Sequence, residues 1–292
     1  MSEVPKRPDP SSTSQHRLRQ IALVAHDLSR VERLLTYVLG TEVVYVDPQV
    51  SQWGLNNFLV AIGGDMIEVV SSIKSDTTAS RLLSKRGDGG YMIIMQTKDA
   101  AKQRARIESR GLAKVIYTHD QDDSLCVQYH PKGIKGGMMP ELDSHQATQS
   151  NPTPLMTTFS PWHACGPLSS YPTYSAAMKR HSDLHLAGAV LRLSPHDSAT
   201  EAASRQWEEI FGIPRSRDLL AFTNARLGFI RGEEGQPEGL VSITIAVEGK
   251  ERFNGILQRA SGAGLCGDGW INMCGVKWYF VEAGESRERS NL

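Results

Sequence analysis

Hydrophobic positions along the first 72 residues follow a strand period, then a helix period, then a strand period again. Residues 20–26 form a short apolar stretch typical of a half-buried strand. Residues 28–39 place leucines and valines on one helical face, and Gly40 follows as a helix C-cap would. Three further strands are predicted at 42–46, 57–62 and 66–71. The pattern therefore predicts a β-α-β-β-β unit.

The same order returns about 72 residues later. The predicted elements are a strand at 90–97, a helix at 99–110 and strands at 114–118, 124–129 and 137–142. Individual residues also correspond: Asp27 with Asp99, Gly40 with Gly111, and Glu68 with Glu141. A tandem repeat builds a pseudo-symmetric body in which equivalent residues converge on a common groove. We therefore expect Glu68 and Glu141 to face one cleft.

In the rest of the chain, the hydrophobic pattern predicts the same order of strands and helices again, with several strands missing. Strands are expected at 186–193, 219–222, 226–231, 239–247 and 271–281, with helices at 200–211 and 250–260. The preceding stretch is rich in Ser, Thr and Pro and has no clear periodicity, which is typical of a connector. The predicted organisation is a disordered leader (1–16), a first domain (17–144, with modules 17–72 and 89–144), a linker (145–183), a reduced second domain (184–284) and a tail (285–292).

The composition of the chain argues against a nucleic-acid-binding or membrane-spanning protein. Lys plus Arg and Asp plus Glu each number 32, so no overall field attracts nucleic acid or an anionic membrane. No apolar run approaches the roughly 20 residues that a membrane span needs. The four cysteines form no C-x-x-C pair, and we expect reduced thiols in a cytoplasmic chain. The end Ser290-Asn291-Leu292 is close to a peroxisomal S-K-L signal, but Asn stands where Lys belongs.

The arrangement resembles the vicinal oxygen chelate superfamily, which includes glyoxalase I, methylmalonyl-CoA epimerase, extradiol dioxygenases and bleomycin-resistance proteins. The resemblance rests on four segments: QIALVAHDLSRVERLLTYVLG, MIEVV, GYMIIMQTKD and HPKGIKGGMMPELD. It implies an α+β fold in which tandem βαβββ modules form a cupped, glyoxalase-like sheet, here followed by a second, reduced domain of the same type. In this superfamily a divalent metal sits in the cup, held by the first and last strands of each module.

Carried over position by position, the resemblance places metal ligands at Gln20, Glu68 and Glu141. The fourth position is Met92, where metal-dependent members usually have His. An amide carbonyl and two carboxylates are hard oxygen donors that suit Mg²⁺, Mn²⁺ or Fe²⁺, whereas a thioether does not. The resemblance allows one divalent metal (Mg, Mn, Fe, Zn or Ni), and Met92 weighs against it.

Three interpretations of this constellation stay open. A metal with open coordination positions could polarise a carbonyl group. Without a metal, two converging carboxylates repel, so one takes up a proton and the pair can act as general acid and base, with Glu68 and Glu141 catalytic. Alternatively, the polar residues only line a binding cup. The expected function is a lyase or isomerase acting next to a carbonyl of a small metabolite, and the alternative is a non-catalytic binder of resistance type.

Other residues are candidates for substrate binding in the cup: Trp53, Phe58, Met92, His26, His119 and His130. Each also has a structural interpretation, as a core aromatic or a turn histidine. Ring-cleaving dioxygenase chemistry is disfavoured, because residues 240–242 lack the histidine that it requires. The expected partner is a small molecule, without nucleic acid or membrane, and a homodimer is an open alternative.

Overall fold

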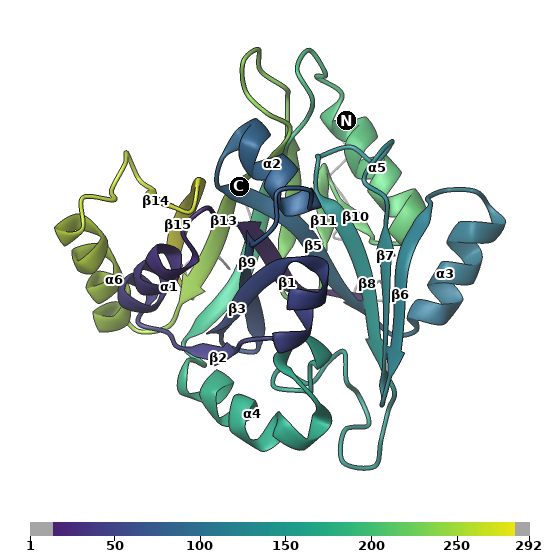
Figure 1. The fold of residues 1–292 in the computed structure, drawn as a ribbon, viewed down its shortest axis with the longest axis horizontal. Helices are drawn as coiled ribbons and strands as arrows, with labels where there is room; N and C mark the ends of the chain where they lie inside the picture. Colours follow the sequence, from purple (N-terminus) through teal and green to yellow (C-terminus); the bar gives the residue numbers. More distant parts are fainter. Residues whose placement is uncertain (1–13, 284–292) are drawn as a thin grey trace, which may run out of the picture.

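The computed structural model describes residues 14–283, which form two mixed sheets flanked by helices (Figure 1). The first half contains β1 (His16–Val24), α1 (Leu28–Leu39), β2 (Val43–Tyr45), the 3₁₀ helix η1 (Pro48–Trp53), β3 (Leu55–Ile62), β4 (Asp65–Ser72), α2 (Thr78–Arg86), β5 (Gly89–Thr97), α3 (Ala100–Ser109), β6 (Val115–Gln121), β7 (Ser124–Tyr129) and β8 (Met139–His145). The connecting segment contains 3₁₀ helices η2 (His163–Cys165) and η3 (Leu168–Ser170) and helix α4 (Tyr171–Arg180). The second half contains β9 (Leu184–Arg192), α5 (Thr200–Phe211), β10 (Arg215–Ser216), β11 (Leu219–Ala221), β12 (Arg226–Ile230), β13 (Gly239–Val247), α6 (Lys250–Gly262), β14 (Ile271–Met273) and β15 (Val276–Glu282).

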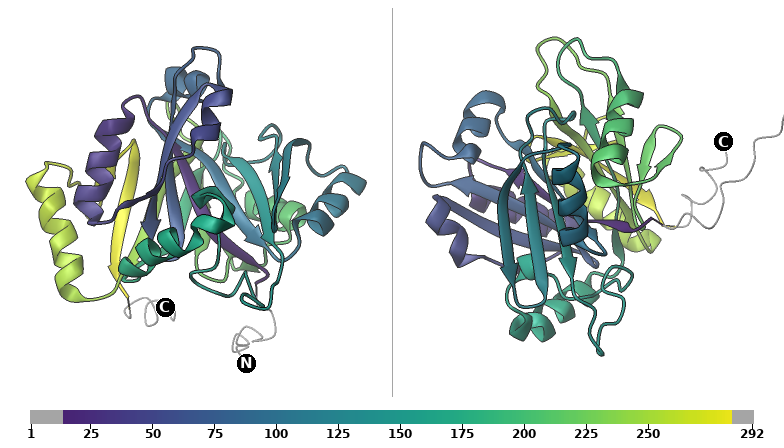
Figure 2. Two further views of the ribbon diagram at one scale, coloured as in Figure 1. Left: turned by 60° about the horizontal axis from the view of Figure 1, so that its bottom comes forward. Right: turned by 90° about the vertical axis from the view of Figure 1, so that its right-hand side faces the viewer.

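The first sheet has eight strands in the order β2-β3-β4-β1-β5-β8-β7-β6. Its centre is the antiparallel pair β1–β5, and each of these strands is parallel to the last strand of its own module, β4 or β8. The two βαβββ modules therefore join edge to edge and curl around one open face (Figure 2). This topology confirms the expected α+β fold of tandem βαβββ modules.

The second sheet has seven strands in the order β10-β11-β12-β9-β13-β15-β14. As expected, this sheet is a reduced copy of the first sheet. Its last module has three strands instead of four, and β10, β11 and β14 span only two or three residues. The sequence pattern missed β10, α2 and α4, and it merged β14 with β15 into one strand. The break between β14 and β15 is a tight turn at Cys274 and Gly275, both with positive φ (52° and 68°), as a two-residue hairpin requires.

The repeated aspartates have a structural role. Asp27 caps α1 by accepting a hydrogen bond from the Arg30 backbone N–H (2.8 Å), and Asp99 caps α3 in the same way through Lys102 (2.8 Å). Gly40 ends α1 with φ of 62°, a left-handed conformation that glycine adopts without strain. The Asp correspondence in the repeat is therefore explained by helix capping.

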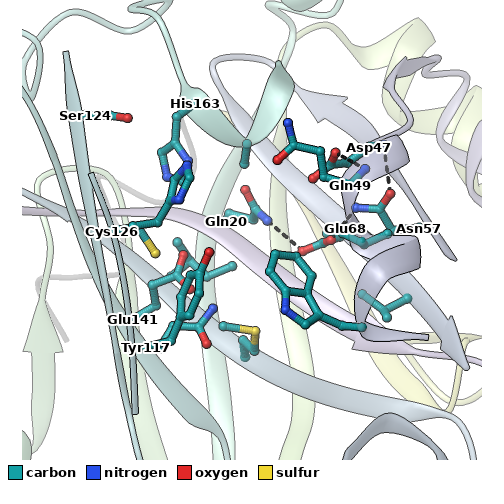
Figure 3. A pocket seen from close by; sticks show the side chains of 18 of the residues that line it. Gln20, Asp47, Gln49, Asn57, Glu68, Tyr117, Ser124, Cys126, Glu141 and His163 are labelled. Atoms are coloured by element: carbon teal, nitrogen blue, oxygen red, sulfur yellow. Dashed lines mark hydrogen bonds between the residues drawn. The ribbon is translucent and has the colours of Figure 1, made fainter. Parts of the chain in front are cut away.

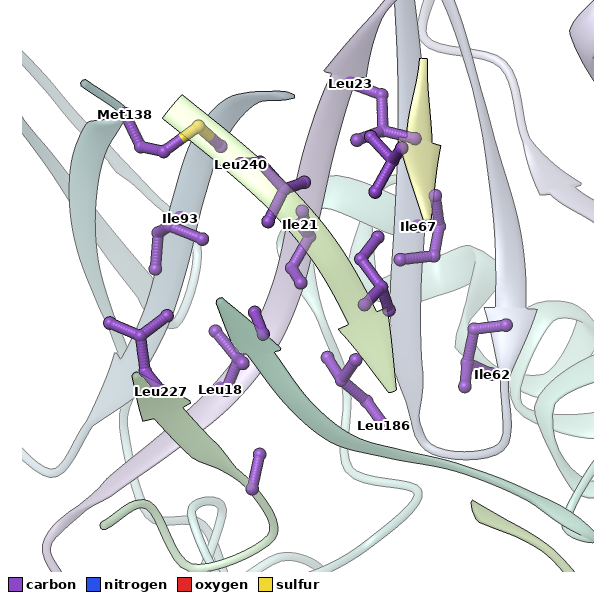
Figure 4. Packing of buried hydrophobic residues seen from close by; sticks show 14 of the residues in the cluster. Leu18, Ile21, Leu23, Ile62, Ile67, Ile93, Met138, Leu186, Leu227 and Leu240 are labelled. Atoms are coloured by element: carbon purple, nitrogen blue, oxygen red, sulfur yellow. The ribbon is translucent and has the colours of Figure 1, made fainter. Parts of the chain in front are cut away.

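The two sheets pack against each other through one face of each. Side chains of β1 such as Leu18, Ile21 and Leu23 lie in one buried cluster with Leu186 and Leu240 of the second sheet (Figure 4). Successive strand residues point to opposite faces, so the alternate residues of β1 face away from this core. Helix α1 contacts α6, and α3 contacts α5, at the two flanks. The far face of the first sheet is left available for a site.

The segment 145–183, expected as a connector, crosses this far face. Its Trp162 is fully buried there, in a cluster with Met66, Ile94 and Tyr174. The fully buried Arg19 holds the segment: its guanidinium donates to the Ser160 carbonyl (2.8 Å) and lies 5.2 Å from the centre of the Trp162 ring. Burial lowers the pKa of Arg19 to about 9. The segment thus forms part of the wall of the cup.

Replacing Trp162 by Ala is expected to destabilise the chain by about 3–5 kcal/mol, because a fully buried indole leaves a cavity. Chemical denaturation measures this loss. Trp53→Ala is the matched control, since Trp53 is 47% exposed and its loss leaves no buried cavity. Equal unfolding midpoints for the two variants would contradict the packing role given to Trp162.

Among residues 14–283, no helix is both long and apolar enough to cross a bilayer. β1 begins at His16, four residues before the predicted strand at 20–26. Most of the predicted leader, all of the predicted tail and the end Ser290-Asn291-Leu292 lie outside the described residues.

Candidate active site

A cavity of about 640 Å³ opens on the far face of the first sheet (Figure 3). Strands β1, β4, β5, β7 and β8 supply its floor, and residues 161–168 of the connecting segment border it. Of the residues predicted from sequence, the cavity brings together Gln20, Glu68, Glu141, Met92, Trp53 and His119. The two glutamates occupy equivalent strands, β4 and β8, of the two modules. They face the cavity from opposite sides of Gln20 (Figure 3).

Glu68 is held by amide groups. Gln20 donates from Nε2 to Glu68 Oε2 (2.9 Å), and Asn57 donates from Nδ2 to Glu68 Oε1 (2.6 Å). The indole N–H of Trp162 donates to Gln20 Oε1 (2.7 Å). An indole can only donate, so this contact fixes the orientation of the Gln20 amide and turns its NH₂ toward Glu68. The segment 145–183 thereby sets the environment of Glu68.

Glu141 lies in a more acidic environment. One carboxyl oxygen each of Glu141 and Asp143 and the Cys126 thiol lie within 4.8 Å of one another, and all three residues are buried. His163 Nε2 and Asp143 Oδ2 share a hydrogen bond (2.8 Å), while Asp143 Oδ1 is buried without a hydrogen-bond partner. The sequence pattern did not predict Asp143, Cys126 or His163 as site residues. Strand alternation could have found Asp143, because residues two apart on β8 share a face.

Burial raises the pKa of both glutamates toward neutrality. The pKa of Glu68 rises to about 7 because burial penalises its charge, and the charge of Glu141 adds to this while the Asn57 and Gln20 hydrogen bonds oppose it. The pKa of Glu141 rises to about 8 through burial and then through Asp143, against the lowering effect of His163. Burial also raises the pKa of Asp143 to about 7. Protonated and ionised forms of the pair therefore coexist near neutral pH.

His163 and His145 link this cluster to the surface. His145 Nε2 accepts a hydrogen bond from the His163 backbone N–H (3.3 Å), and its Nδ1 faces Asp123 Oδ1 (3.3 Å). Burial lowers the pKa of His145 to about 4 and also lowers the pKa of His163. Neither histidine could be assigned from sequence. His163 follows the buried Trp162 in a stretch without periodicity, so its placement depends on how that stretch packs.

Three predicted substrate-binding residues lie elsewhere, and those expectations are corrected. Phe58 points to the opposite face of β3 from Asn57 and packs in the core between the sheets, 1% exposed. His26 is exposed at the start of α1 and pairs with Asp88 (2.8 Å). His130 is a turn residue whose Nδ1 accepts from the Lys132 backbone N–H (3.0 Å). Neither histidine lines the cavity.

The donor set Gln20, Glu68 and Glu141 does not fit a shared divalent ion as it stands. The Gln20 carbonyl oxygen is engaged by Trp162, and both Glu68 oxygens accept amide N–H groups. Met92 also lines the cavity at the position where a fourth ligand would be needed. Within the described part of the chain, the group that could hold a metal is Cys126, Glu141 and Asp143, whose thiol and carboxyl groups suit zinc or iron once deprotonated.

No protein-family model matches the sequence, and no curated protein sequence is similar to it. Solved structures match part of the chain. A Streptomyces coelicolor methylmalonyl-CoA epimerase variant in complex with 2-nitronate-propionyl-CoA is 22% identical and covers 45% of this chain and 98% of its own, with a TM-score of 0.40. The Mycobacterium tuberculosis methylmalonyl-CoA epimerase is 21% identical, covers 44% of this chain and 88% of its own, and also has a TM-score of 0.40. These values describe a similarity of backbone arrangement over less than half of the chain.

Proposed function

We propose that the protein is an isomerase-type enzyme that moves a proton at a carbon next to a carbonyl group of a small metabolite. The observation that carries this is geometric: Glu68 and Glu141 are buried carboxyl groups on equivalent strands, and both face one cavity. A substrate carbon between them can lose a proton to one carboxylate and gain one from the other carboxylic acid. The pKa values of about 7 for Glu68 and about 8 for Glu141 support this division of roles at neutral pH.

Neutral donors in the cavity can stabilise the enolate that proton removal creates. Tyr91 lines the cavity, and burial raises the pKa of its phenol to about 12, so the phenol stays protonated. The Gln128 amide also lines the cavity, on the Glu141 side. Groups of this kind, placed where negative charge develops, contribute strongly to catalysis in water-excluded sites.

An epimerase is an isomerase of the proposed kind, and the methylmalonyl-CoA epimerases act on a CoA thioester. The cavity of this chain is the basis for assigning an isomerase. The CoA substrate of those enzymes is not assigned to this protein. A second function, sequestration of a ligand without turnover, is favoured by the apolar side chains on the cavity floor, among them Met92, Ile94 and Val70.

Proton exchange into a carbonyl compound tests the proposal. The protein is incubated in D₂O with a panel of small ketones and α-branched thioesters, and loss of the α-proton signal is followed by NMR. We expect exchange with at least one compound, and none with the Glu68→Gln/Glu141→Gln double variant. A compound that binds in the cavity without exchanging its α-proton would support the sequestering function instead.

A further inference from the structure

The rim of the cavity carries an excess of negative charge. Besides the two buried glutamates, four aspartates line the cavity: Asp47, Asp76, Asp122 and Asp123. Within the described part of the chain, Arg81 is the one Lys or Arg side chain that lines it. Four formal negative charges against one positive charge leave the mouth net negative even when both glutamates are protonated. Low-dielectric walls focus such a field into the cavity.

Arg81 is engaged by its own helix rather than directed to a ligand. Its guanidinium donates to the Asp76 backbone carbonyl (2.7 Å) and to Thr78 Oγ1 (3.0 Å) at the start of α2. Lys74, next to this loop, is exposed and does not line the cavity. Residues 14–283 therefore supply the cavity with no basic cluster of the kind that recognises phosphate or carboxylate groups.

Aromatic rings stand at the same mouth. Trp53 from η1 and Tyr117 from β6 line the cavity with ring centres 5.8 Å apart in an edge-to-face arrangement. His119 stacks on Tyr117 at 6.2 Å. Trp53 is 47% exposed, so part of its ring is accessible to a ligand at the mouth of the cavity. Aromatic faces attract cations, and nearby carboxylates strengthen that attraction.

We infer that the substrate is a carbonyl compound carrying a positively charged group, which the rim holds between its aspartates and aromatic rings. This rests on the proposed function for the carbonyl part and on the rim for the charge. It distinguishes the cavity from one built for CoA thioesters, whose phosphates would meet the aspartates. The ligand binds in the cavity, and the acidic rim determines the sign of the charge that the ligand can carry.

The test uses three aryl ketones of similar shape and different charge. They are para-acetyl-trimethylanilinium (cationic), para-tert-butylacetophenone (neutral) and para-acetylbenzoate (anionic). Calorimetry at low salt should show the cation binding about tenfold more tightly than the neutral compound and the anion binding most weakly. The difference between the three should shrink at high salt, because exposed charges are screened. Binding of none of the three, or of the anion as tightly as the neutral compound, would overturn the inference.

Variants that remove negative or positive charge from the rim should change the affinity for the cation in opposite directions. Asp76→Asn/Asp122→Asn should lower the affinity for the cation several-fold, whereas Arg81→Gln should raise it. The matched control is Glu234→Gln/Asp268→Asn, which removes two exposed acidic charges outside the cavity. It should leave the order of the three affinities (cation, neutral compound, anion) unchanged. If Arg81→Gln instead lowered the affinity for the cation, or Asp76→Asn/Asp122→Asn left that affinity unchanged, the inference would be wrong.

The charge order is also measured in the Glu68→Gln/Glu141→Gln protein, which keeps the rim. If the order persists while the unsubstituted protein exchanges no α-proton, the proposed function fails and the inference stands. If the protein exchanges α-protons but prefers anions, the inference fails and the proposed function stands.

Discussion

The Glu141→Gln variant is expected to exchange α-protons about 10²–10⁴-fold more slowly than the unsubstituted protein, the usual contribution of a positioned general acid or base. Glu68→Gln should have an effect of the same order. Glutamine keeps the size of the side chain and removes its ability to carry a proton to and from carbon. NMR detection of deuterium incorporation measures both rates, and thermal unfolding verifies that each variant is folded.

Stereochemistry distinguishes two carboxyl groups that act on opposite faces of a substrate from a single base. With an α-chiral compound, each single variant should lose inversion, and the slow proton exchange that remains should be confined to one enantiomer. Glu248→Gln is the control, because Glu248 is exposed and pairs with His185 in the second half of the chain. Inversion at the normal rate in both single variants would rule out the proposed pair.

The free energy of unfolding is expected to fall as pH rises from about 6.5 to about 8, which is the second large effect. Between about pH 4 and 6.5, His16 and His145 act in the opposite direction to the buried carboxyl groups, because burial lowers the pKa of both histidines to about 4. Burial raises the pKa of Glu141 from 4.5 to about 8 in the folded chain. Between these values the folded state binds more protons than the unfolded state, so raising the pH favours unfolding. Each pH unit in this window costs about 1.4 kcal/mol for one such group. Glu68 and Asp143 contribute in the same direction, because burial raises their pKa values to about 7.

Glu141→Gln and Asp143→Asn should therefore unfold at higher temperature than the unsubstituted protein at pH 9 and show a much smaller difference at pH 5. Differential scanning calorimetry in the presence of a chelator makes the comparison, since a metal bound at Cys126, Glu141 and Asp143 would remove their protons. Glu42→Gln is the control, because the Arg180 hydrogen bond lowers the pKa of Glu42. Parallel stability curves for Glu141→Gln and the unsubstituted protein would contradict burial of a titrating carboxyl group at this position.

Part of the site follows from strand alternation alone. Glu68 and Glu141 occupy equivalent places in the repeat, and Gln20 lies on the same face of the sheet. The same rule places Asp143 beside Glu141 and separates Asn57, which faces the cavity, from Phe58, which faces the core. Asp143 and Asn57 could thus have been found from the sequence, and Phe58 excluded.

The repeated modules, their capped helices and the face of the sheet that carries the glutamates are predictable from the sequence, because they depend on local periodicity. Tertiary structure alone decided which groups surround those glutamates. Trp162 and His163 come from a stretch without periodicity, and their positions depend on long-range packing around Arg19 and the open face of the sheet. The raised pKa values of Glu68 and Glu141 also depend on the tertiary structure, since a carboxyl pKa depends on burial and on neighbouring charges that only the folded chain brings together.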